Sequence, residues 1–380
     1  MPTIIHTADI HLGAPLGWLG KKAREQRDEL GRALTRIVDK ALDERVGCLV
    51  IAGDLFDSNS PPASAVRHAL SEFRRLSEIS DAVAVVLPGS HDHLGRGSVY
   101  LSYREEFKSV EGLTVLGLDG QETVAIPHLG LAVHGRPPRW NRSTDHQLAR
   151  LEPDHSLPFN IVVAHGTLDT VPRADDDLPI DLSEVSGTPW SYAALGHWHS
   201  WHEVPGSEVP ALYPGAPEVI APSQSGAGFA ARVDLTTEGA EISQVRIGAR
   251  RVVTADVDVT STRGTHEIVE RVRYEAPPGR DTILRLALGG LLDLDADFDE
   301  AGLLEALEPD YFHVCPPERR YRVKLGREDL ERLSERLVIG RFVRLMQEKI
   351  SGAKSDEERE RVEAAMQMGV ALLLGKDVLG

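Results

Sequence analysis

The sequence predicts an α/β fold with a parallel sheet covered by helices, and two observations carry that prediction. Short apolar runs begin at residue 4 and occupy residues 48–52 and 83–87, a length typical of buried strands. Residues 21–46 and 63–79, which lie between these runs, carry apolar side chains at helical spacing. Such alternation favours right-handed crossovers between parallel strands, whose carboxyl ends meet at one edge of the sheet.

The following segments are shorter and are interrupted by glycine and proline. Residues 112–133 have this pattern, which suits a second sheet, and apolar runs at 161–164, 192–195 and 230–235 predict further strands. Three segments rich in acidic residues, proline, glycine or serine are expected to be loops, namely 169–189, 212–218 and 223–228.

The pattern changes again after residue 248. The sequence predicts a small α+β domain with strands at 251–259, 281–288, 311–315 and 321–325 and helices at 264–274 and 298–307. Two amphipathic helices, at 327–350 and 356–374, complete the chain. We therefore expect three parts, with boundaries at 1–248, 249–326 and 327–380.

Length and composition exclude several classes of protein. A chain of 380 residues with 41% hydrophobic and 27% charged residues indicates a globular protein of two or three domains. Its two cysteines, Cys48 and Cys315, give no disulfide framework, and no secretory signal or membrane-spanning run is visible. We expect a cytoplasmic protein. The net charge of −17 argues against a broad nucleic-acid-binding surface on this chain alone.

Aspartate and histidine follow five of the predicted strands. The first strand leads to Asp9 and His11, the second to Asp54, and a later one to His165. Residues two apart on extended backbone project to the same side, so Asp9 and His11 can face one cation, as can the two histidines of the Gly-His-Trp-His199 motif. Mixed imidazole and carboxylate ligation suits manganese, iron or zinc, and two such ions can clamp a phosphoryl centre.

The order of these motifs resembles that of the calcineurin-like metallophosphoesterases: Asp-x-His, Gly-Asp, Gly-x-His-Asp, His-Gly and Gly-His-x-His. The forms Asp-Ile-His-Leu-Gly13 and Gly-Asp-Leu-Phe-Asp57 are similar, more narrowly, to the SbcD-type DNA repair nucleases and their YhaO-like relatives. The resemblance spans the whole chain. It implies a two-sheet sandwich flanked by helices, a small α+β capping domain, and C-terminal helices that dock on an SbcC/Rad50-like ATPase.

The resemblance also implies a role for each motif residue. One metal ion would be held by Asp9, His11, Asp54 and His199, and a second by Asp54, Ser90, His165 and His197. His91 would protonate the leaving oxygen, with Asp92 orienting it. The expected cofactors are two divalent ions, most in keeping with Mn2+, and the expected partners are DNA, the ATPase and a second copy of the chain.

Ser90 departs from the family pattern, which has asparagine at this position. A serine hydroxyl is shorter and a weaker donor than an amide oxygen, so we expect the second ion to bind more loosely. The serine is either a natural variant or an introduced substitution, and the sequence leaves both open.

Outside the cluster, five arginines are candidate DNA contacts. Arg136, Arg139 and Arg142 flank Trp140 in one loop, a combination of cations and an aromatic ring that nucleic-acid sites use, and Arg96 and Arg104 follow the His91 loop. Solvated surface arginines are the simpler interpretation of all five.

Three functions remain open from the sequence. The favoured one is a manganese-dependent DNA exonuclease or endonuclease subunit of a double-strand-break repair complex. The others are a phosphoesterase acting on nucleotides or similar small molecules, and a catalytically weak scaffold that holds the ATPase, which Ser90 favours.

Overall fold

The computed structural model describes residues 1–143, 147–148, 151–168, 178–186, 190–293, 296–324 and 337–373. The chain divides into two compact units, Met1–Val252 and Val253–Gly380. The division falls four residues after the predicted boundary at 248. The second predicted boundary, at 326, lies outside the described residues, so a separate third part stays a prediction.

The first unit is built on a sheet with the strand order β14-β13-β1-β2-β3-β4. β1 to β4 are mutually parallel, whereas β13 and β14 are antiparallel to their neighbours. The strands are β1 (Thr3–Thr7), β2 (Cys48–Ala52), β3 (Val83–Leu87), β4 (Leu113–Val115), β13 (Phe229–Thr236) and β14 (Gly239–Arg246). The parallel alternation predicted from the first third of the sequence is therefore confirmed.

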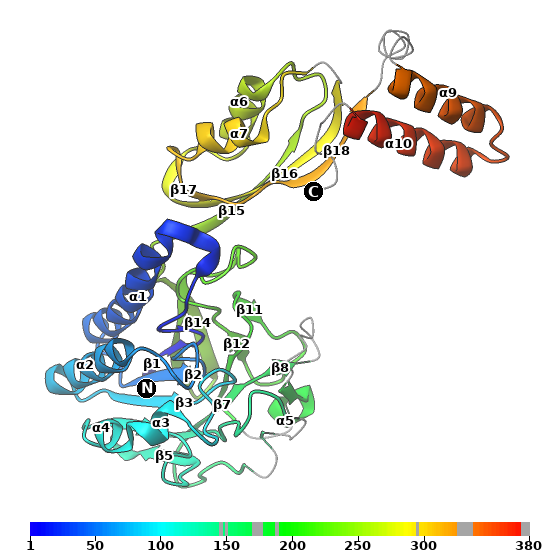
Figure 1. Cartoon of the computed structure of the whole chain (residues 1–380). Helices are drawn as coiled ribbons and strands as arrows, with labels where there is room; N and C mark the ends of the chain where they lie inside the picture. Colours follow the sequence, from blue (N-terminus) through cyan, green and yellow to red (C-terminus); the bar gives the residue numbers. More distant parts are fainter. Residues whose placement is uncertain are drawn as a thin grey trace. The chain divides into compact units, whose positions relative to one another are not determined.

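Two long helices connect the first three parallel strands. α1 (Ala23–Asp43) buries Leu30, Leu34, Ile37 and Ala41, the apolar positions that its sequence spacing placed on one face. α2 (Ala63–Ile79) packs beside it (Figure 1). Within its described residues, the first unit also has the shorter helices η1 (Gly17–Lys22), α3 (Val99–Ser102), α4 (Arg104–Lys108), η2 (Pro127–Leu129) and α5 (Leu182–Ser186).

A second sheet has the order β11-β12-β10-β7-β6-β5. Its strands are β5 (Thr123–Ile126), β6 (Leu131–His134), β7 (Phe159–His165), β10 (Tyr192–Gly196), β11 (His202–Glu203) and β12 (Ala211–Tyr213), and a separate small pair is formed by β8 (Thr167–Leu168) and β9 (Pro179–Ile180). The two large sheets share one core of fully buried aliphatic side chains, for example Ile4 and Val85 from the first sheet with Val133 and Val163 from the second. Burial of each such side chain contributes roughly 1.5–3 kcal/mol, so the two sheets hold each other in place.

Three local predictions were wrong. The segment at 113–115 extends the first sheet as β4, because it pairs with β3, rather than joining the second sheet. Residues 212 and 213, expected to begin a loop, belong to β12 (Ala211–Tyr213), which lies beside β10. Within the predicted loop 169–189, the described residues form β9 and α5, and the others lie outside the described residues.

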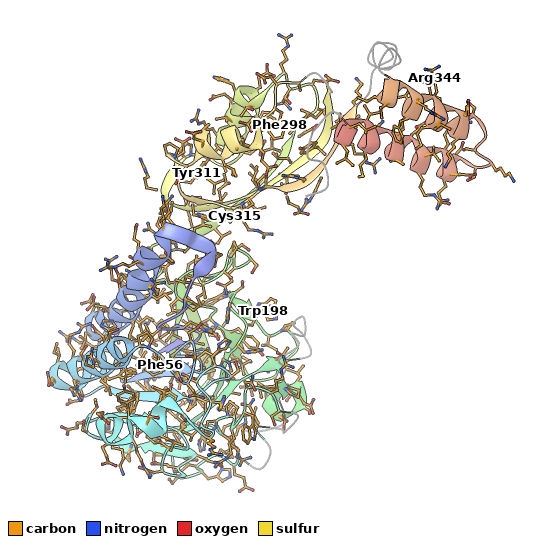
Figure 2. All side chains as sticks on the ribbon, viewed as in Figure 1. Phe56, Trp198, Phe298, Tyr311, Cys315 and Arg344 are labelled. Atoms are coloured by element: carbon orange, nitrogen blue, oxygen red, sulfur yellow. The ribbon has the colours of Figure 1, made fainter. Side chains whose placement is uncertain are left out.

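The described residues of the second unit, 253–293, 296–324 and 337–373, form most of a four-stranded sheet and two pairs of helices. The sheet consists of β15 (Arg251–Asp258), β16 (Gly279–Asp293), β17 (Tyr311–Val314) and β18 (Glu318–Lys324), and the helices are α6 (Thr265–Glu275), α7 (Glu300–Leu307), α9 (Leu337–Ser351) and α10 (Asp356–Leu373). Tyr311, labelled in Figure 2, is buried in the core that the sheet shares with α6 and α7.

The last two helices form a small pair of their own. Ile339 and Val343 of α9 pack against Met366 and Val370 of α10. A Cβ at Gly369 would lie 2.3 Å from the ring of Phe342, so the glycine allows the helices to approach closely. The first ten residues of the predicted helix 327–350 lie outside the described residues. None of the described helices is long and apolar enough to cross a membrane.

Candidate metal centre

The candidate centre lies where the carboxyl ends of three parallel strands of the first sheet meet those of two parallel strands of the second. Asp9 and His11 follow β1, Asp54 follows β2, and Ser90 follows β3. His165 is the last residue of β7, and the remaining two histidines, His197 and His199, follow β10. Fold topology thus brings together all seven residues that the motifs predicted.

The backbone at this edge adopts a conformation that non-glycine residues avoid. The φ angles of Asp9, His11, Asp54 and His197 are 55°, 50°, 53° and 99°, all in the left-handed region. Each such residue costs on the order of 1–3 kcal/mol, which only a well-supported site retains. The backbone N–H groups of Asp9 and His11 donate to the carbonyl oxygens of Gly53 and Asp54, each at 3.0 Å, so the first two strand ends hold each other in this shape.

The ligand atoms form two neighbouring groups. Asp9, His11 and His199 place one nitrogen or oxygen each within 4.8 Å of one another, and so do Asp54, His165 and His197. One carboxylate oxygen of Asp54, Oδ2, lies 3.2 Å from His165 Nε2 and 3.7 Å from His11 Nε2. Asp54 is therefore positioned between the two groups, as a bridging ligand must be.

Other residues fix which nitrogen of three histidines faces the centre. Asp57 Oδ1 lies 3.1 Å from His11 Nδ1, the carbonyl oxygen of Ala52 lies 2.9 Å from His165 Nδ1, and the Gln224 amide contacts His199 Nδ1. With Nδ1 facing an oxygen acceptor, His11 and His165 present Nε2, and such acceptors also raise the basicity of a ligating imidazole. His199 likewise turns Nε2 toward the centre, 3.5 Å from Asp9 Oδ1, but the Gln224 amide nitrogen is a donor, so it meets the lone pair of Nδ1.

Asp57 and Gln224 had no role assigned from sequence. Asp57 stands in the Gly-Asp-Leu-Phe-Asp motif, which was a usable signal, because its last residue is three positions from Asp54. Gln224 lies in a segment rich in glycine and serine, far along the chain from His199, and the sequence carries no signal for this contact.

Two glycines make room for the ligands. A Cβ at Gly53 would lie 2.0 Å from His165 Nδ1, and one at Gly89 would lie 2.3 Å from Asp54 Oδ1. Gly53 is therefore required because His165 of β7 approaches its backbone closely, and Gly89 is required because the Asp54 carboxylate does.

The residues fit a pair of divalent cations. Asp9 and Asp54 are both buried, and buried carboxylates are stable only when positive charge compensates them. His11 Nε2 is buried and has no hydrogen-bond partner among the described residues, which is the state of a nitrogen that awaits a ligand. Burial lowers the pKa of His165, but the charge and hydrogen bond of Asp54 outweigh this and raise it to about 9, so cation binding there must displace a proton.

Ser90 occupies the expected place in the second group. Its hydroxyl donates to Asp54 Oδ2 at 3.2 Å and lies 3.4 Å from His165 Nε2, and the side chain is buried. The hydroxyl thus lies beside both the bridging carboxylate and an imidazole of the same group.

His91 is exposed at the centre. Its Nδ1 lies 2.9 Å from the carbonyl oxygen of Asp57, its backbone N–H donates to Asp54 Oδ1 at 2.8 Å, and its ring centroid is 4.7 Å from that of His11. The surrounding protein removes some water from the His91 ring, which lowers its pKa. The charge of Asp54 and the Asp57 carbonyl outweigh this effect, so the pKa of His91 lies above its usual value.

Asp92 does not take the orienting position expected for it. Its buried carboxylate accepts hydrogen bonds from Gly89 N at 2.6 Å, Phe56 N at 3.1 Å and Tyr100 Oη at 2.7 Å. The His91 ring is instead held by the Asp57 carbonyl. Asp92 makes no such contact because it turns inward, where its hydrogen bonds to Gly89 N and Phe56 N fix the loop after β3 to the loop after β2.

A cavity of about 730 Å³ opens over these groups. Its lining includes Asp54, Ser90, His91, His197 and His199 from the centre. The other lining residues are Thr167 of β8 and, from the surrounding loops, Asp57, Ser58, Asn59, His93, Asn141, Trp198, Ser200, Ser223 and Gln224. The volume is within the range of sites that bind small molecules or single residues of a polymer.

The five candidate arginines divide into two sets. The Arg104 guanidinium pairs with Asp119, and Arg136 pairs with Glu122 at 2.7 Å, so each of these charges already has a local acidic partner. The side chains of the other three, Arg96, Arg139 and Arg142, are exposed. Ion pairing of the first two was invisible in the sequence, because Asp119 and Glu122 come from a different loop.

These features are those of a metal-dependent phosphoesterase. The chain belongs to the calcineurin-like phosphoesterase family, whose model matches residues 2–201. It is therefore a metal-dependent enzyme of this class, and the resemblance expected from the motif order is confirmed.

Several relatives narrow the comparison. "DNA double-strand break repair protein Mre11" of Aeropyrum pernix is 29% identical over 289 residues, which cover 71% of this chain and 67% of that protein. The SbcD component of the SbcCD nuclease of Bacillus subtilis is 23% identical and is matched over 97% of this chain and 98% of its own length. The "Uncharacterized metallophosphoesterase YhaO" of the same organism is 28% identical, and the match spans 56% of this chain and about half, 52%, of that relative.

Solved structures give weaker likenesses. A dimetal phosphatase from Danio rerio is 14% identical with a TM-score of 0.40, covering 65% of this chain and 99% of that one. The protein TT1561 of Thermus thermophilus is 15% identical with a TM-score of 0.39, covering 64% of this chain and 99% of that one.

Proposed function

We propose that this chain is a two-metal phosphodiesterase that cleaves DNA as the SbcD-like subunit of a double-strand-break repair complex in the cytoplasm. The observation that carries the proposal is the position of Asp54 between two groups of ligand atoms. The names of the relatives supply the substrate class, since relatives matched across most of this chain are named as a repair protein and a nuclease subunit.

The two groups hold the ions. Asp9, His11, Asp54 and His199 would hold one ion, and Asp54, Ser90, His165 and His197 would hold the other. Imidazole with carboxylate favours a transition metal, and Mn2+ is the ion we assign. A bound pair of this kind polarises the phosphoryl group and generates a nucleophile at neutral pH.

The chain's own residues would then position the substrate and protonate the leaving oxygen. His91 lies beside Asp54, whose charge, together with the Asp57 carbonyl, raises the pKa of the His91 ring and so favours its protonated form. With Nδ1 held by the Asp57 carbonyl, Nε2 is the atom that donates a proton to the departing oxygen. Asp92 acts indirectly, by fixing the loop that carries His91.

Ser90 supports a second candidate, a scaffold subunit with weak catalysis. The hydroxyl contacts Asp54 and His165 but is shorter than the family's asparagine, which leaves the second ion one strong ligand short. In that function the chain binds its ATPase partner and cleaves little.

We assign the ATPase-binding surface to α9 and α10. These helices pack against each other and still expose large apolar side chains, which are unusual on a helix pair with no partner. The exposed side chains are Val338, Leu345, Met368, Leu372 and Leu373. A homodimer is also part of the proposal and is carried by the family resemblance alone.

For DNA contacts we retain Arg96 and Arg139, whose side chains are exposed, and Arg142, which is exposed and also has a contact within the protein. We no longer favour Arg104 and Arg136, because their charges are paired with Asp119 and Glu122.

The test is manganese-dependent cleavage of end-labelled single-stranded and duplex DNA, compared with hydrolysis of nucleotides. We expect oligonucleotide cleavage by the chain and its loss in His91→Ala. His128→Ala, which changes an exposed histidine in η2, is the matched control. Cleavage of nucleotides alone would assign the small-molecule function instead. Complex formation with little or no cleavage by the wild-type chain, and cleavage restored in Ser90→Asn, would assign the scaffold whose second ion lacks one ligand.

A further inference from the structure

Trp140 stands out among the large apolar side chains of the first unit. It is 61% exposed, whereas tryptophan side chains are on average highly buried. Its ring lies beside that of His93, with centroids 6.4 Å apart, and His93 lines the cavity over the metal centre. The next residue, Asn141, lines the same cavity. Trp140 is therefore an exposed aromatic ring beside the opening of the site.

The loop that carries Trp140 is fixed to the loop that carries His91. Leu94 N donates to the carbonyl oxygen of Pro138 at 2.9 Å. A Cβ at Gly95 would lie 2.1 Å from the Arg139 carbonyl oxygen, so the two backbones touch at a point where only glycine fits.

The His93 side of this arrangement is fixed as well. Asn59 Nδ2 donates to the His93 carbonyl oxygen at 3.0 Å, and the Asn59 Oδ1 accepts from Val99 N at 3.0 Å. Trp140 thus follows a backbone segment of defined position relative to His91. A ring that is placed but not covered is available to a ligand.

The chemistry of the surroundings selects the ligand. Arg139, which precedes Trp140, is exposed; its charge also acts on Glu122, whose pKa is lowered chiefly by its hydrogen bond with Arg136 and further by Arg139. An aromatic face next to a cation and an amide suits a nucleobase joined to a phosphodiester, because every base offers a face for stacking and every linkage offers an anion. An acyclic or sugar phosphate lacks the flat apolar face that this ring requires.

We infer that Trp140 is a stacking platform for an unpaired nucleobase next to the scissile phosphate. The inference rests on the proposed nuclease function and narrows its substrate to strands with unpaired nucleotides at the site of cleavage. A base inside a duplex has both faces covered by its neighbours, so it can reach Trp140 only after leaving the stack. Single strands and frayed ends are therefore the preferred substrates.

The test compares two end-labelled strands of about 12 nucleotides, one of thymidine and one of abasic sites with the same phosphates, cleaved by the full chain with Mn2+. Wild type has the lower KM for the thymidine strand. Trp140→Ala raises that KM by roughly 5- to 150-fold, toward the value for the abasic strand, which is the loss expected for one stacked base. Trp140→Phe keeps most of the preference, because the aromatic face remains.

Two controls separate stacking from other effects. Ile79→Ala removes a side chain that is similarly exposed, at 64%. Ile79 is the last residue of α2, which leads into the edge of the sheet opposite the metal centre. We expect this variant to leave both KM values unchanged. Arg139→Gln lowers the slope of log KM against log salt by about 0.7, since it removes one phosphate contact, whereas Trp140→Ala leaves the slope unchanged.

Equal KM values of wild type for the two strands overturn the inference, as does a Trp140→Ala effect of the same size on both. If both strands are cleaved, either of these two results overturns only the stacking role of Trp140 and leaves the proposed nuclease function intact. Cleavage of neither strand by wild type or by Ser90→Asn is the distinct outcome that overturns the proposed function and this inference with it.

Discussion

Ser90 Oγ donates a hydrogen bond of 3.2 Å to Oδ2 of Asp54, the carboxylate that lies between the two groups of ligand atoms. The residue at this position therefore acts on the shared ligand as well as on the second ion. A hydroxyl proton bound to Oδ2 competes with a cation for the same oxygen lone pairs. An asparagine amide at this position has a carbonyl oxygen that adds a ligand.

The first prediction concerns this contact. Ser90→Asn tightens binding of the weaker of two Mn2+ ions by roughly 10- to 100-fold, the size of effect that changes around metal ligands produce. Isothermal titration calorimetry measures both ions. Ser98→Asn, a buried serine that caps α3, is the control for a serine change in the same loop region. Unchanged binding of both ions by Ser90→Asn would show that position 90 supplies no ligand.

Asp57 is predicted to act through His11. Asp57→Asn removes the carboxylate that faces His11 Nδ1 but keeps the backbone carbonyl that holds His91. We expect a 10- to 100-fold loss of affinity for the first ion, because the imidazole loses its negatively charged partner, roughly as other such partners do. Calorimetry with Asp28→Asn, an exposed aspartate of α1, as control measures the effect. Equal affinity in Asp57→Asn and wild type contradicts an orienting role.

Gly53 is predicted to be irreplaceable. In Gly53→Ala the new methyl group would lie 2.0 Å from His165 Nδ1, at a residue whose φ is 91°. The left-handed backbone alone costs on the order of 1–3 kcal/mol of unfolding free energy, and displacement of His165 removes a ligand. Denaturant unfolding and metal titration report both effects. Gly17→Ala, where no atom lies within 4 Å of the added Cβ, leaves both measurements near wild type. A Gly53→Ala protein with wild-type metal binding would contradict the close packing of β2 against His165.

His6 is predicted to make the fold acid-sensitive. Burial lowers the pKa of His6 to about 3, and the ring is held at Nδ1 by Tyr192 Oη at 2.8 Å. The folded chain keeps His6 neutral while the unfolded chain protonates it below about 6.5, so the unfolding free energy falls as the pH drops from 6.5 toward 3, by at most about 1.4 kcal/mol per pH unit for this group.

The variant His6→Asn separates this effect from packing. It lowers stability at every pH because the buried ring is lost, but it reduces the slope of unfolding free energy against pH between 6.5 and 4.5. Urea unfolding at several pH values measures the slope, and His128→Asn, at an exposed histidine, keeps the wild-type slope. An unchanged slope in His6→Asn would place the acid sensitivity elsewhere.

The strand-end positions of Asp9, Asp54 and His165 were predictable, because a parallel sheet places residues that follow its strands at one edge whatever the loops do. The contacts that the loops make could not be predicted from the sequence. Asp92 turns inward to Tyr100, and the His91 ring takes the Asp57 carbonyl instead, a choice set by the local turn and not by residue spacing.

Ion pairs and strand pairs between segments that are distant in the sequence could not be predicted either. Arg104 meets Asp119 across a loop, and residues 113–115 join the first sheet because β3 has a free edge there. Each depends on which segments lie side by side after folding, and a single sequence carries no record of that.

The central claim is that two cations, shared through Asp54, make this chain a DNA-cleaving enzyme. The most direct measurement titrates Mn2+ into the purified chain while counting bound ions and following cleavage of an end-labelled oligonucleotide. We predict cleavage that rises only as the second ion binds, at a lower Mn2+ concentration in Ser90→Asn than in wild type. Full activity with one ion bound, or no cleavage by either protein with both ions bound, would contradict the account.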